Sequence, residues 1–139
     1  MKSSLRFFLL MFILASNVVF SASISVISTG SYSYTQQGDE LIGGQKASIT
    51  WNIIIKDSSN AVVTISSWHA PFTCEGSYTI SNEKDYTALS WSGKNNEDSE
   101  CDIPSPQILL KKSSSGRILI HSELFPWNNK GWQTVREIR

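Results

Sequence analysis

Apolar and polar residues alternate with a period of two along most of this chain. In residues 46–56, one face holds Ala47, Ile49, Trp51, Ile53 and Ile55, and the other is polar apart from Ile54. Because successive side chains of a β-strand point to opposite sides, this pattern predicts a strand with one buried face. No segment shows an apolar stripe with helical spacing, so the chain is predicted to be all-β.

Clusters of turn-forming residues separate the apolar runs. Asp57–Asn60 and Ser113–Gly116 are two of them, each as long as a hairpin connection. They divide the chain into about eight strands, which we place at residues 24–36, 46–56, 60–68, 73–81, 85–91, 106–112, 117–124 and 131–138. Hairpin connections favour an antiparallel meander, and about eight strands close into a small filled barrel.

A β-sandwich is the alternative architecture. In an immunoglobulin-type sandwich, two cysteines bracket a core tryptophan over a long span. Cys74 and Cys101 bracket Trp91, but they lie too close together for that pattern. The small antiparallel barrel is therefore the preferred prediction.

The first residues of the chain have a different character from the rest. A basic start is followed by an apolar run over residues 7–15 and by small residues at 21–23. This order is typical of a secretory signal peptide, with cleavage expected after Ser21 or Ser23. The polar residues Ser16 and Asn17 leave the run shorter than the roughly 20 residues that span a bilayer. A retained membrane anchor is therefore the less favoured interpretation.

We accordingly expect a signal peptide over residues 1–23 and a single β domain over 24–139, in a secreted or periplasmic protein. Export would place Cys74 and Cys101 in an oxidising compartment, where they are expected to form one intramolecular disulfide. Two buried thiols or a bridge between chains are the alternatives. No long apolar stretch follows the signal peptide, so no membrane association is expected after cleavage.

The charge balance argues against two further classes of partner. The whole chain has 12 Lys and Arg against 12 Asp and Glu. Loss of Lys2 and Arg6 with the signal peptide would leave a small acidic excess. Nucleic acids and anionic lipid surfaces are bound by clustered cations, so neither is an expected partner.

Groups able to carry out catalysis are scarce. The only histidines are His69 and His121, and the chain has no Gly-x-Ser-x-Gly elbow. The acidic cluster Glu97–Asp102 lacks the regular spacing and the turn glycine of a calcium loop. We therefore expect a non-enzymatic protein without a metal or other cofactor.

Two features suit contact with a partner. The first is an acidic cluster formed by Glu97, Asp98, Glu100 and Asp102, which the expected disulfide would tether through Cys101. The second is aromatic: Trp68 and Trp127 stand beside turn residues, where they would anchor a protein interface or stack on sugar rings.

The first functional hypothesis is an inhibitor or immunity-type protein that occludes a basic cell-wall hydrolase. In this hypothesis the acidic cluster enters the cleft, and Trp68 or Trp127 supplies the apolar anchor. The alternative is a module that binds a glycan or another small ligand. Its ligand would lie in the mouth of the barrel or on the loop Trp127–Trp132.

Overall fold

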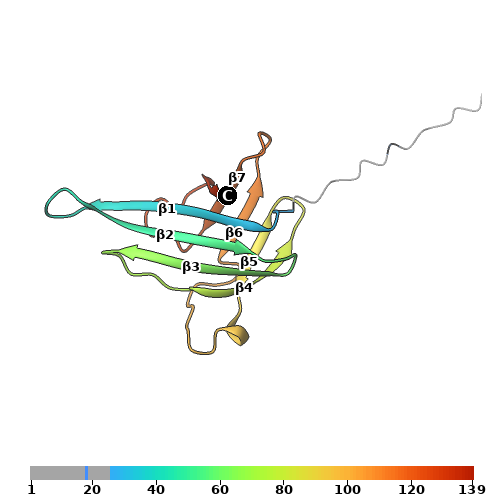
Figure 1. Ribbon diagram of the computed structural model, residues 1–139, viewed down its shortest axis with the longest axis horizontal. Helices are drawn as coiled ribbons and strands as arrows, with labels where there is room; N and C mark the ends of the chain where they lie inside the picture. The colour runs from blue at the N-terminus through green and yellow to red at the C-terminus, as the bar shows by residue number, and fades with distance from the viewer. Residues whose placement is uncertain (1–17, 19–25) are drawn as a thin grey trace, which may run out of the picture.

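A nine-stranded antiparallel sheet forms the body of the protein in the computed structural model (Figure 1). The strands are β1 (Gly30–Glu40), β2 (Lys46–Ile55), β3 (Asn60–Trp68), β4 (Gly76–Asn82), β5 (Thr87–Trp91), β6 (Ile108–Lys112), β7 (Ile118–Ser122), β8 (Gln133–Thr134) and β9 (Arg136–Ile138). The structure describes residue 18 and residues 26–139. Apart from Val18, the expected signal peptide lies outside the described residues.

The C-terminal segment closes the sheet into a nearly complete barrel. β8 pairs with β7, whereas β9 pairs with β1 at the other edge of the sheet. Only Val135 separates the two short strands, and its N–H donates to the carbonyl oxygen of Ile118 (2.9 Å). The predicted last strand, 131–138, is therefore two strands that bridge β7 and β1. The sheet order still begins at β8 and ends at β9, and among the described residues β1 has no strand partner on the side of β9 beyond Ser33.

The antiparallel barrel is confirmed, and the sandwich alternative is wrong. The first seven predicted strands correspond to β1 through β7. Each of these strands pairs with the next one in the chain, as expected for a meander. The first strand is displaced: β1 runs from Gly30 to Glu40 rather than over 24–36. Its last residues are polar and show no alternation, but they stay paired with β2 as far as Glu40 and Lys46, with a register shift between Gln37 and Glu40.

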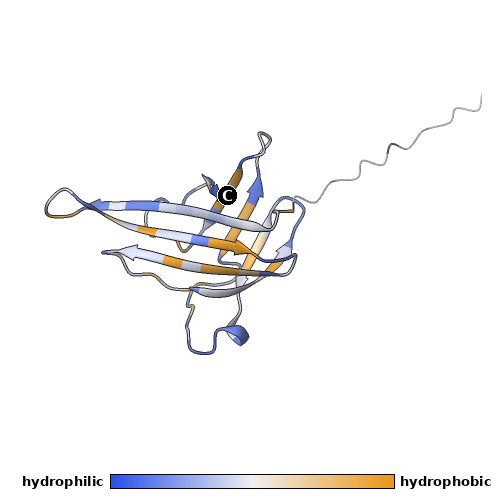
Figure 2. Ribbon diagram, viewed as in Figure 1, coloured by the Kyte–Doolittle hydropathy of each residue, from blue (hydrophilic) through white to orange (hydrophobic). Residues whose placement is uncertain are grey.

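The interior is filled by the inward faces of these strands. Apolar and polar segments follow one another along β2 and β3 (Figure 2). The largest buried side chains include Trp51, Tyr32 and Tyr78. Phe125, from the connection between β7 and β8, is also buried, with its ring centroid 4.8 Å from that of Trp51. This ring fills the interior at its own end of the barrel.

One disulfide joins Cys74, just before β4, to Cys101 in the connection between β5 and β6. The Cα atoms are 4.6 Å apart, and the bond spans a sequence separation of 27 residues. Cys74 is almost completely buried, and its carbonyl oxygen accepts a hydrogen bond from the Tyr78 hydroxyl (2.5 Å). The expected intramolecular pairing is confirmed.

Candidate binding surface

The topology gathers the long connections at one end of the barrel. In an antiparallel meander, every second connection lies at the same end. Residues 41–45, 69–75, 92–107 and 123–132 therefore share one end, which we call the long-loop end. The opposite end, the short-turn end, holds residues 56–59, 83–86 and 113–117. All the residues predicted to contact a partner belong to the long-loop end.

The two ends differ in charge. Among residues 26–139, the carboxylates in or beside the long loops are those of Asp39, Glu40, Glu75, Glu97, Asp98, Glu100, Asp102 and Glu123. The cations there are Lys46, Lys94 and Lys130. In the short turns and beside them, Lys56, Lys84, Lys112 and Arg117 stand with Asp57, Glu83 and Asp85. The long-loop end is therefore acidic, although the whole chain is nearly neutral.

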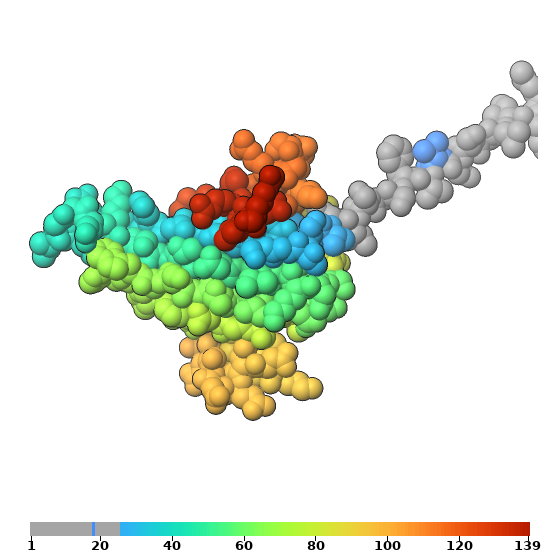
Figure 3. Space-filling view, viewed as in Figure 1, coloured from blue at the N-terminus to red at the C-terminus, as the bar shows by residue number. Residues whose placement is uncertain are grey.

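Residues 92–107 form a lobe that projects from the barrel beside β4 (Figure 3), which we call the acidic lobe. Asn96 attaches it to β4. The Ser77 N–H donates to Asn96 Oδ1 (2.8 Å), and Asn96 Nδ2 donates to the Ser77 carbonyl oxygen (2.8 Å). One side chain thus pairs with both backbone groups of a strand residue, as a neighbouring strand would.

Gly76 makes this attachment possible. A Cβ atom on Gly76 would lie 2.3 Å from Asn96 Oδ1, and the φ of Gly76 is +131°. Both the close approach and the positive φ require glycine.

Gln107 fixes the other end of the acidic lobe. Its side chain is buried, with 3% of the residue exposed. Nε2 donates to the Ile103 carbonyl oxygen (2.8 Å), and Oε1 accepts from the Trp91 N–H (2.7 Å). Together with the disulfide, these bonds give the acidic lobe three separate attachments to the barrel.

The predicted acidic cluster lies on the outside of this lobe. Glu97, Asp98, Glu100 and Asp102 are all exposed. Within residues 26–139, no Lys or Arg side chain lies within 4.0 Å of a carboxylate oxygen, and the one contact of this kind is between His121 Nε2 and Glu123 (3.9 Å), so the carboxylates of the cluster are not paired with neighbouring cations. They therefore present uncompensated negative charge to solvent.

Trp68 is exposed at the end of β3. It is 39% exposed, and its ring meets that of His69 edge-on with centroids 4.1 Å apart. It borders a hollow of about 390 Å³ that is also lined by Gln45, Lys46 and Ser48. From Trp68 the chain runs directly to Cys74, and the Thr73 hydroxyl donates to the Glu100 carbonyl oxygen (3.3 Å). The exposed tryptophan and the acidic lobe are therefore joined by a short segment.

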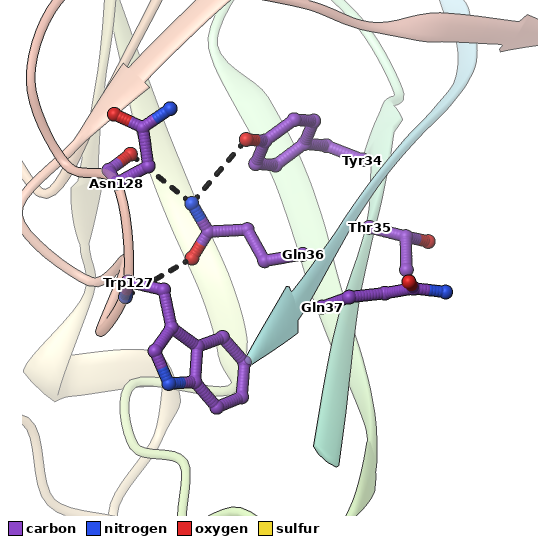
Figure 4. Close-up of a pocket in the computed structure, with 6 residues that line it drawn as sticks. All are labelled: Tyr34, Thr35, Gln36, Gln37, Trp127 and Asn128. Carbon is purple, nitrogen blue, oxygen red and sulfur yellow. Dashed lines mark hydrogen bonds between the residues drawn. The ribbon is translucent and has the colours of Figure 1, made fainter. Parts of the chain in front are cut away.

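Trp127 is placed differently from Trp68, because it is partly buried and packs against the core. Its ring covers Gly38 so closely that a Cβ atom there would lie 2.0 Å from the indole. Trp127 also borders a second hollow of about 210 Å³, lined by Tyr34, Thr35, Gln36, Gln37 and Asn128 (Figure 4).

Two exposed apolar side chains at this end were not predicted as site residues. Ile42, at the tip of the β1–β2 hairpin, is fully exposed, and Phe72 is 49% exposed. The sequence signal was present in both cases. Leu41 and Ile42 stand between charged residues and two glycines, and Phe72 follows Trp68 within a turn.

The described residues contain no group of three or more His, Cys, Asp or Glu side chains that could hold a metal ion. Burial raises the pKa of the Tyr78 hydroxyl, which lies next to the disulfide.

No helix in the described part of the chain is long and apolar enough to cross a membrane.

Comparison with known proteins gives no relative: no protein-family model, no curated protein and no solved structure matches the chain.

Proposed function

We propose that this chain is an exported, non-enzymatic binding protein that docks its long-loop end on a basic protein. The partner we propose is a cell-wall hydrolase whose active-site cleft is occluded by the acidic lobe. The observation that carries this proposal is an unneutralised acidic cluster on a lobe that is held to the barrel at three points.

The attachments of the lobe bear on affinity. A loop that becomes ordered only on binding loses conformational entropy at that moment, and this loss weakens the complex. In the acidic lobe, Asn96, Cys101 and Gln107 already hold the backbone in place. A partner would therefore meet carboxylates whose positions are largely set before contact.

The charge of the long-loop end bears on the rate of association. Complementary charge raises the encounter rate of two proteins, and salt screens this effect. An acidic end on a nearly neutral protein would also orient the molecule as it approaches a basic cleft. The short-turn end would face away from the partner.

Trp68 and Phe72 supply the apolar part of the proposed interface. Exposed aromatic side chains near the centre of an interface often contribute most of the binding energy. These two precede Cys74, and the Thr73–Glu100 hydrogen bond joins their segment to the acidic lobe. We therefore assign them the anchoring role, ahead of the partly buried Trp127.

The test uses a basic muramidase and its hydrolysis of cell walls, followed by turbidity. The protein is expected to inhibit the muramidase in a stoichiometric manner. The charge reversal Glu97→Lys, Asp98→Lys and Glu100→Lys is expected to weaken inhibition at least tenfold and to reduce its dependence on salt.

A matched control reverses three charges away from the long-loop end: Glu83→Lys, Asp85→Lys and Glu137→Lys. This control should inhibit as the unchanged protein does. Equal inhibition by the two triple variants would show that the acidic lobe is not the contact surface. No inhibition of any basic cell-wall hydrolase by the unchanged protein would reject the proposed partner class.

A further inference from the structure

The hollow beside Trp127 is formed where β1 loses a partner strand. β9 ends its pairing with β1 at Ser33, opposite Arg136. Beyond this point, Trp127 and Asn128 lie next to β1, where they contact Gln36 and Gly38. The result is a hollow of about 210 Å³ between the edge of β1 and the β7–β8 connection (Figure 4).

Gln36 gives this hollow a fixed wall. It points inward and is only 5% exposed. Nε2 donates to the Asn128 carbonyl oxygen (3.1 Å) and to the Tyr34 hydroxyl (3.3 Å), and Oε1 accepts from the Trp127 N–H (3.4 Å). Figure 4 shows this side chain between Tyr34, Trp127 and Asn128. The buried amide therefore holds two residues of the loop at a set distance from β1.

Other polar groups around the hollow remain available to a ligand. The Tyr34 hydroxyl accepts from Gln36 and keeps its own proton to donate. The Asn128 side chain is exposed, and its amide has no hydrogen-bond partner in residues 26–139. Thr35 and Gln37 point their side chains away in Figure 4, so they contribute backbone to the wall.

We propose that this hollow binds one unit of a neutral saccharide. None of its six lining residues is charged, which disfavours an ionic ligand. A sugar ring carries hydroxyl groups that both donate and accept, together with C–H faces that pack on aromatic rings. Two aromatic side chains, the Tyr34 hydroxyl and the Asn128 amide match this combination. The volume is below that of typical drug-sized pockets, which favours a single sugar unit over an enclosed chain.

Phe125 disfavours the other location considered for a small ligand, the interior of the barrel. Its ring centroid lies 4.7 Å from that of Tyr34 and 4.8 Å from that of Trp51, so these side chains fill the mouth. A saccharide bound in the hollow would lie outside this aromatic cluster and would contact the outer parts of Tyr34 and Trp127.

The test is a titration with chitotriose and with cellotriose, observed through the indole N–H signals of the tryptophans in a two-dimensional nitrogen–proton spectrum. We expect at least one of the two sugars to shift the Trp127 signal while the Trp68 signal stays in place. Asn128→Ala should weaken binding about tenfold, whereas Asn129→Ala, its exposed neighbour that does not line the hollow, should not change it.

Three results would overturn the proposal: an unmoved Trp127 signal with both sugars, equal affinities for the two alanine variants, or a shift confined to Trp68. The proposal does not depend on the hydrolase. The charge reversal at Glu97, Asp98 and Glu100 should leave the saccharide affinity unchanged, so the two proposals can fail separately.

Discussion

The attachment of the acidic lobe to β4 can be tested by replacing Asn96 with alanine. The substitution removes both hydrogen bonds to Ser77, each 2.8 Å long. A hydrogen bond contributes a net 0.5–1.5 kcal/mol, so the pair contributes about 2 kcal/mol to holding the lobe closed. The loss should appear in local opening of the lobe more than in global unfolding, because the disulfide and Gln107 remain.

The assay is native-state amide hydrogen exchange, read at the Ser77 N–H. A loss of about 2 kcal/mol corresponds to exchange roughly 30-fold faster. The control is Asn95→Ala, since the exposed side chain of Asn95 makes no such contact. Unchanged exchange at Ser77 in the Asn96→Ala protein would refute the claim that this side chain fixes the lobe.

Gly76 provides a second check on the same contact. As a single substitution, Gly76→Ala should lower the free energy of unfolding, because its Cβ would lie 2.3 Å from Asn96 Oδ1 and because the φ of this residue is positive. In the Asn96→Ala background only the backbone strain remains, so Gly76→Ala should lower the free energy of unfolding by a smaller amount. Equal losses in the two backgrounds, measured by urea unfolding, would contradict the described packing.

Three further predictions concern stability. Replacing Cys74 and Cys101 with alanine should lower the free energy of unfolding by about 3.5 kcal/mol, from the chain-entropy relation for the 27-residue separation; an unchanged urea midpoint would contradict this. Phe125→Ala should lower the free energy of unfolding by about 3–5 kcal/mol through the cavity left beside Trp51. A decrease below about 1 kcal/mol in the same assay would argue against the packing of the Phe125 ring in the core. Burial raises the pKa of Tyr78, so the native state keeps a proton that the unfolded chain releases above about pH 10. Stability should therefore fall as the pH rises above that value, by up to about 1.4 kcal/mol per pH unit. Tyr78→Phe should flatten this fall and Tyr86→Phe should not; identical slopes in both variants would contradict the assignment.

The strands of the barrel were largely readable from the sequence, because their determinants are local. The alternation in residues 46–56 reflects the pleat of β2, whose inward side chains are buried as predicted. Turn residues likewise located the ends of most strands. The division of the last strand could not be read in this way. It depends on the pairing of β8 with β7 and of β9 with β1, which only the nearly closed barrel establishes.

The candidate surface was predictable in composition but not in arrangement. The acidic cluster and Trp68 were evident as exposed features, and the disulfide followed from the presence of two cysteines. The roles of Gln36 and Asn96 were not evident, because these side chains attach a strand to a loop through hydrogen bonds with residues 92 and 19 positions away in the chain. Trp127 looked equivalent to Trp68 in sequence, yet its contact with Gly38 withdraws it from the surface.

The most direct test of the central claim is a footprint of the bound protein by amide hydrogen exchange, with a basic muramidase as the partner. The account predicts that binding slows exchange in residues 69–75 and 92–107, at the long-loop end. It predicts no change in the turns at 56–59, 83–86 and 113–117. Protection confined to those short turns would show that the partner contacts the opposite end of the barrel and would contradict the account.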